Sequence, residues 1–116
     1  MDKFEVIFLE QAKLFLDKLD DKTRKKVIFN IWKSKKVNNP ELFKKLTNEI
    51  WEFRTKYLSK QIRLFAFWDK TNKTKTLVIS SNGFIKKTKK TPKGEIEKAE
   101  QIRNEYFKQK KGGQKI

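Results

Sequence analysis

Arginine and lysine residues in the second half of the chain have the types and spacing needed to bind phosphate groups. Arg54 and Arg63 fall in two consecutive strand-like runs, and five lysines follow within the ten residues Phe84–Lys93. Arginine presents a planar fork that contacts two phosphate oxygens at once, and lysine adds a compact positive charge. This combination indicates chemistry on a phosphodiester backbone.

The lysine-rich segment ends where a helix is expected to begin. Thr91 has the residue type of an N-cap and Pro92 that of a first helical residue, where its missing N–H costs nothing. The free N–H groups and positive dipole end of a helix N-terminus favour phosphate, so we expect a phosphate cradle here. Besides Lys86 and Lys87, the expected contacts are Thr88, Lys89, Lys90 and Lys93. The alternative is a solvated surface run of lysines.

Strand alternation is expected to bring the two arginines onto a common face. The polar face of the run Glu49–Tyr57 consists of Glu52, Arg54 and Lys56. In the next run, Arg63 lies opposite an apolar face, so Arg54 and Arg63 can meet on the exposed side of one sheet. The alternative is a surface ion pair of either arginine with Glu52 or Asp69, worth at most about 1 kcal/mol.

The formal net charge of +16 makes a polyanion the expected partner. Residues 1–53 hold 12 basic and 9 acidic side chains, whereas residues 54–116 hold 18 and 5. Residues 54–93 hold 12 basic side chains and one acidic residue, Asp69. Nucleic acid is therefore the expected ligand of the second half. Binding to a membrane surface is not expected, because the basic residues do not fall on an amphipathic helix.

The chain has neither cysteine nor histidine. This excludes disulfides and thiolate nucleophiles, and it argues against a transition-metal site, so no metal or cofactor is expected. The longest apolar run, Leu64–Trp68, is far shorter than a membrane span, and the first residues lack the features of a secretion signal. A cytoplasmic location is the expectation.

The first half of the chain predicts one strand and two helices. Alternating residues from Lys3 to Leu9 favour a strand. A helix is expected from Glu10, with Asp20-Asp21 ending it and capping the next helix, which should stop before Pro40. The apolar positions of the two helices are Ala12, Phe15, Leu16 and Leu19, then Val27, Ile28, Ile31 and Trp32.

The second half predicts an antiparallel sheet and a last helix. The strand-like runs are Glu49–Tyr57, Gln61–Lys70 and Thr74–Phe84, and short polar links make them antiparallel neighbours. The helix after Thr91 should reach about Lys108 and pack along an edge, so we expect one domain over residues 1–109 and a flexible tail over 110–116. The tryptophans Trp32, Trp51 and Trp68 are expected in the core, while Phe65 and Phe67 are candidates for base stacking.

Several short blocks occur in a fixed order along the chain. They are Trp51–Arg54, Ile62–Leu64, Gly83–Thr88 and Lys90–Pro92, followed by Glu95, Ile96, Ala99 and Arg103. Their order and spacing over about residues 4–107 resemble HigB-type toxins of the RelE/ParE-like superfamily. The most specific part is Gly-Phe-x-Lys-Lys-Thr followed by Lys-Thr-Pro.

The resemblance implies an α+β fold with an N-terminal strand, a helical hairpin packed on an antiparallel sheet, and a C-terminal helix. It also implies a toxin of a type II toxin–antitoxin pair that cuts mRNA on the ribosome, with an antitoxin partner, commonly of helix-turn-helix type. The residues that match the family's basic motif positions are Arg54, Arg63, Lys86 and Lys87. Many relatives have histidine where this chain has Asn82, so a histidine acid or base is absent from that position here.

Cleavage by the RNA 2′-hydroxyl needs a base, an acid and stabilisation of the charged phosphorane. Arginine stays protonated, so Arg54 and Arg63 suit charge stabilisation and support of the leaving group. Crowded cations disfavour a protonated amine, which makes Lys86 or Lys87 a candidate base, with Glu52 as the alternative. Preorganisation of the RNA by a scaffold would fit dependence on the ribosome.

Two other functions fit the same observations. A ParE-like toxin acts on gyrase and would damage DNA while leaving mRNA intact. A non-catalytic nucleic-acid-binding module would show strongly salt-dependent binding without cleavage, since a fold does not fix a function.

Overall fold

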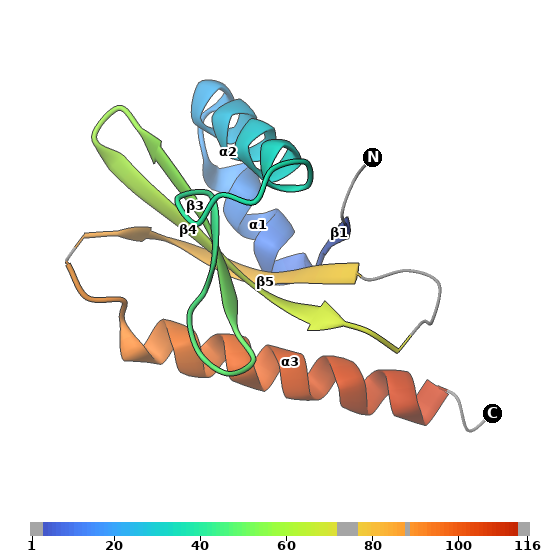
Figure 1. The fold of residues 1–116 in the computed structure, drawn as a ribbon. Helices are drawn as coiled ribbons and strands as arrows, with labels where there is room; N and C mark the ends of the chain where they lie inside the picture. The colour runs from blue at the N-terminus through green and yellow to red at the C-terminus, as the bar shows by residue number, and fades with distance from the viewer. Residues whose placement is uncertain (1–3, 72–76, 88, 114–116) are drawn as a thin grey trace.

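The described part of the chain, residues 4–71, 77–87 and 89–113 of a computed structural model, folds into five strands and three helices (Figure 1). The elements are β1 (Glu5–Phe8), α1 (Glu10–Lys18), α2 (Asp21–Ser34), β2 (Phe43–Lys45), β3 (Trp51–Tyr57), β4 (Lys60–Asp69), β5 (Leu77–Lys86) and α3 (Lys93–Gly113). The strand order is β1–β5–β4–β3–β2, with β1 parallel to β5 and the other pairs antiparallel. The expected α+β fold is confirmed.

The helical hairpin α1–α2 covers one face of the sheet (Figure 1). The buried residues of this core are Phe4, Ala12, Leu16, Leu19, Val27, Ile31, Phe53, Ile62, Leu64 and Ala66. The ring of Phe15 lies so close to Gly83 that a Cβ atom at this position would overlap it. Glycine is therefore what lets α1 approach β5.

Asp20 separates the two helices, as the sequence predicts. Its carboxylate accepts hydrogen bonds from the backbone N–H and the hydroxyl of Thr23, at 3.2 and 2.6 Å. These bonds lower the pKa of Asp20 below its ordinary value, which is the signature of an N-cap carboxylate. Arg24 strengthens the corner by donating to the carbonyl oxygens of Leu16 and Leu19, at 2.9 and 2.6 Å.

Helix α3 covers the opposite face of the sheet and buries Ile50, Phe65, Phe67 and Ala99 (Figure 1). Two expectations are wrong here. The helix packs on a face and not along an edge, because Phe107 adds to its apolar side. Phe65 and Phe67 are 0% exposed beneath it, so they are core residues and not platforms for bases.

Asp69 fixes the C-terminal half of α3 to the end of β4. Its buried carboxylate accepts hydrogen bonds from the Tyr106 hydroxyl and the Lys110 ammonium, both at 2.6 Å, and from Thr71. Burial alone would raise the pKa of Asp69, but the bonds from Lys110, Thr71 and Tyr106 lower it well below its usual range. Burial, together with the bond to Asp69, raises the pKa of Tyr106 to about 12.

Some elements differ from the sequence-based expectations. Strand β2 was not expected. Trp32 is 55% exposed, because the buried stripe of α2 centres on Val27 and Ile31 and turns this ring outward. Helix α3 begins at Lys93 and runs past the expected end near Lys108 to Gly113, while 72–76 and 114–116 lie outside the described residues.

No helix in the described ranges combines the length and the apolar character needed to cross a membrane.

Candidate functional site

Arg54 of β3 and Arg63 of β4 are direct partners in the antiparallel register. The hairpin turn between these strands sets that register, because Leu58 and Ser59 both have positive φ, 48° and 67°, as a type I′ turn requires. The expected pairing of the arginines is confirmed. Their expected common exposure is wrong, since Arg63 is 4% exposed and only Arg54 reaches the surface.

Glu52 lies against both guanidinium groups. Its Oε1 is 3.4 Å from Nε of Arg54 and 3.5 Å from Nε of Arg63, and the residue is 4% exposed. Within the described residues, neither Nε atom nor Glu52 Oε2 has a hydrogen-bond partner. The contact is therefore electrostatic, and two guanidinium charges around one carboxylate leave a surplus of positive charge.

The guanidinium of Arg63 is held in place by the chain around it. Nη2 donates to Oε1 of Gln61 at 2.9 Å, and Nη1 donates to the Ile62 carbonyl at 3.3 Å. Burial lowers the pKa of Arg63 below its ordinary value; the charge of Glu52 opposes this shift, and that of Arg54 adds to it. A bound phosphate would supply the second negative charge that this group of side chains lacks.

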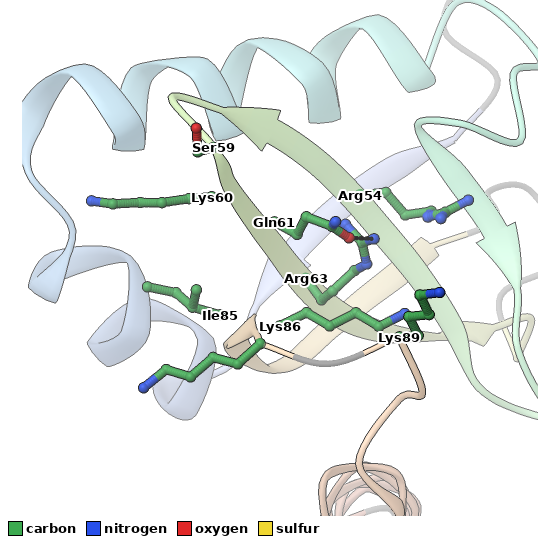
Figure 2. A pocket seen from close by; sticks show the side chains of 9 residues that line it. Arg54, Ser59, Lys60, Gln61, Arg63, Ile85, Lys86 and Lys89 are labelled. Atoms are coloured by element: carbon green, nitrogen blue, oxygen red, sulfur yellow. Dashed lines mark hydrogen bonds between the residues drawn. The ribbon is translucent and has the colours of Figure 1, made fainter.

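A cavity of about 710 Å³ opens over the arginine pair (Figure 2). Its lining residues are Arg54, Ser59, Lys60, Gln61, Arg63, Ile85, Lys86, Lys87 and Lys89. Six of these nine are basic and none is acidic, so we call this hollow the basic cavity. Figure 2 shows Arg54, Gln61 and Arg63 projecting from β3 and β4, with Lys86 and Lys89 below them in this view. The arrangement suits the binding of a phosphate and the stabilisation of added negative charge.

A second hollow of about 430 Å³ adjoins the basic cavity. It shares Arg54, Gln61 and Arg63 with that cavity and adds residues from α2 and from the edge of β3, among them Lys26, Asn30 and Lys56. The arginine pair thus borders two hollows, and a polyanion longer than one phosphate has room on either side of it.

The structure brings most of the expected site residues together. Arg54, Arg63, Lys86, Lys87 and Lys89 line the basic cavity, Lys56 lines the adjoining hollow, and Glu52 contacts the arginines. Lys90 and Lys93 are exposed and line neither hollow, and Thr88 lies outside the described residues. Across the described ranges, no three His, Cys, Asp or Glu side chains form a group that could hold a metal ion.

Asn82 lies outside the basic cavity, beneath the start of α3. It is 1% exposed, and its Oδ1 accepts a hydrogen bond from the Ser81 hydroxyl at 2.7 Å. Its Nδ2 donates to the Glu95 carboxylate at 3.3 Å. The residue therefore joins β5 to the first turn of α3 and does not line the basic cavity.

Sequence reasoning missed four lining residues: Ser59, Lys60, Gln61 and Ile85. Gln61 could have been predicted as a lining residue, because it stands two residues before Arg63 and therefore lies on the same face of β4. Ser59 and Lys60 depended on the type I′ turn, whose usual Asn-Gly signal is absent here.

A comparison with protein families identifies a match to the model described as phage-derived protein, Gp49-like (DUF891). The match extends over residues 14–104 and therefore covers most of the chain, from α1 into α3. It includes both arginines and the lysines that line the basic cavity. A comparison with curated proteins finds no match.

Proposed function

The chain belongs to the Gp49-like family, a toxin family of toxin–antitoxin pairs within the RelE/ParE-like superfamily, and we propose that it is an mRNA endoribonuclease. In this proposal it cleaves ribosome-bound mRNA without a metal ion and is restrained by an antitoxin, commonly of helix-turn-helix type. The resemblance of its motif blocks to HigB-type toxins supports this branch. The observation that carries the proposal is the basic cavity, which is lined by six basic residues, the Arg54–Arg63 pair among them, and by no acidic residue.

The reaction needs no covalent contribution from the protein. The 2′-oxygen attacks the adjacent phosphorus as its proton leaves, and the bond to the 5′-oxygen breaks as that oxygen gains a proton. The products are a 2′,3′-cyclic phosphate and a 5′-hydroxyl. The protein must therefore position the RNA strand, transfer two protons and stabilise the charge of the phosphorane.

Arg54 and Arg63 have different roles in this proposed reaction. Arg54 is partly exposed and can contact a phosphate oxygen directly. Arg63 is buried and held by Gln61 and Glu52, so it contributes a fixed positive charge beneath the phosphate. A charge that is already in place costs no reorganisation during the reaction.

The base is assigned to Lys86 or Lys87 in this proposal. Both line the basic cavity, whereas Glu52 is 4% exposed and lies against two guanidinium groups. A carboxylate in that position has little access to the 2′-hydroxyl of an RNA strand. Its role in this proposal is to orient the two arginines.

The test is primer extension on mRNA after brief induction of the protein in cells, with Arg54→Ala in parallel. Discrete cuts within translated frames that disappear in the variant would support the proposal. Intact mRNA with growth arrest and DNA damage would replace it with action on gyrase. Intact mRNA with continued growth would replace it with a non-catalytic binding module.

A further inference from the structure

A second groove, with no lining residue in common with the basic cavity, lies where β4 ends and β3 begins. It has a volume of about 700 Å³. The turn between β2 and β3 reaches across to α3 beside it (Figure 1). The residues of this groove that matter here are Lys45, Trp51, Trp68, Lys70, Arg103 and Phe107, and we call it the aromatic groove.

Three cations from separate parts of the chain meet at the aromatic groove. Lys45 ends β2, Lys70 follows β4, and Arg103 comes from α3. One carboxylate, that of Glu49, also lines the groove, and it is 3.2 Å from Nη2 of Arg103. The two lysines are exposed, so the groove keeps a positive surplus that would attract phosphate.

The aromatic rings that line this groove are only partly buried. Trp51 and Trp68 lie in an edge-on pair with centroids 5.7 Å apart, and each remains partly exposed. Phe107 from α3 is partly exposed as well, with the Arg103 guanidinium 5.1 Å from its ring centre. The Lys70 ammonium lies 5.8 Å from the ring of Trp68. Partly exposed tryptophan beside cations is a combination that can bind unpaired bases together with their phosphates.

We propose that the aromatic groove is a second binding site for single-stranded RNA, with a base stacked on Trp51 or Trp68 and its phosphate against Lys45 and Lys70. This site lies outside the proposed cleavage centre and does not depend on cleavage. A strand rise of about 3.3 Å per residue places Trp51 about 10 Å along β3 from Arg54. The groove would hold a part of the RNA distant from the scissile bond, or a different strand.

Tryptophan fluorescence tests the proposal, because two of the three tryptophans line the groove. The Trp32→Phe protein removes the exposed reporter on α2. The probe is a short single-stranded 2′-O-methyl oligoribonucleotide, which lacks the attacking hydroxyl and cannot be cut by that route. Addition of the probe should quench the remaining fluorescence. Lys45→Gln/Lys70→Gln should weaken this binding about tenfold and reduce the slope of log affinity against log salt by about 1.4, or about 0.7 for each lost phosphate contact.

The matched control is Lys25→Gln/Lys33→Gln, which removes the same charge from exposed positions on α2. It should leave most of the affinity intact. Equal weakening in the two double variants would overturn the proposal, because binding would then follow net charge alone. Absence of quenching, or its loss in Arg54→Ala, would also overturn it. Quenching that persists in a protein without ribonuclease activity would support this groove while the proposed cleavage fails.

Discussion

The carboxylate of Asp69 and the ammonium of Lys110 lie 2.6 Å apart, although 41 residues separate them along the chain. Asp69 closes β4 and is 1% exposed, whereas Lys110 belongs to the last turns of α3. A buried carboxylate needs partners to stay charged, and this one has Tyr106 and Thr71 in addition to the lysine. The pair therefore fixes the far end of α3 to the sheet.

Asp69→Asn should lower the free energy of unfolding by about 1–3 kcal/mol at neutral pH, because it removes the charge of a buried acceptor that the partly exposed Lys110 contacts. The pKa of Asp69 is lowered from 3.8 in the folded state, so its stabilisation is complete above about pH 4 and is lost as the pH falls further. Urea denaturation at pH 7 and pH 3 checks this. The difference between wild type and variant should shrink at pH 3, while the exposed-site control Asp17→Asn stays near wild type at both.

Tyr106→Phe should retain the ring contacts with Phe67 and lose about 1 kcal/mol of stability with the bond to Asp69. Since the pKa of Tyr106 is raised from 10.0 to about 12, its contribution is complete below pH 10 and is lost between pH 10 and 12. Absorbance titration of the two tyrosines should show a transition near pH 12 that is missing from the variant. A late transition that survives the substitution would contradict the assignment.

Gly83→Ala should destabilise the protein by about 1–3 kcal/mol, because the new methyl group overlaps the ring of Phe15. Gly94→Ala is the matched control. Among the described residues, no atom outside its chain neighbours and the backbone of its own helix lies within 4 Å of a Cβ placed there, and alanine favours the first turn of α3 by about 0.5–1 kcal/mol. In thermal denaturation, Gly83→Ala should have a lower Tm than the wild-type protein, and Gly94→Ala should have an equal or higher Tm. Equal effects would show that α1 does not require glycine on β5.

Glu52→Gln should lower RNA cleavage by about tenfold or more, because the two guanidinium groups lose the charge that orients them. The pH dependence of kcat/KM separates the roles of this residue. A positioning residue lowers the rate at every pH and leaves the shape of the profile unchanged. If the acidic limb of the profile disappears in the variant, Glu52 is the base and the assignment to Lys86 or Lys87 is wrong.

Local patterns in the sequence were sufficient to predict the helical hairpin and the pairing of the two arginines. Asp20 lies in a helix-capping signal, and period-2 alternation places Arg54 and Arg63 on one face, so short-range rules apply directly. The burial of Arg63 could not be predicted from such local patterns. It depends on neighbours such as Glu52, whose contact with Arg63 arises only when β3 and β4 pair.

Long-range packing accounts for most of what sequence reasoning missed. The sequence pattern predicts α3 along an edge of the sheet, because Phe107 adds to its apolar side only once Phe67 lies opposite it. The burial of Phe65 and Phe67 follows from the same contact. Strand β2 has three residues, two of them lysines, and is defined by its pairing with β3 and not by its own pattern.

The two faces of the sheet carry separate apolar cores, and α3 is the helix that covers one of them. Detachment of this helix would cost the contacts of Phe65 and Phe67 but would leave the packing of the α1–α2 hairpin in place. Partial opening should therefore proceed through α3 before the sheet melts. Backbone amides of α3 should exchange with deuterium ahead of those in β4, and the polar bonds of Asp69 and Asn82, at opposite ends of the helix, would set how often that opening occurs.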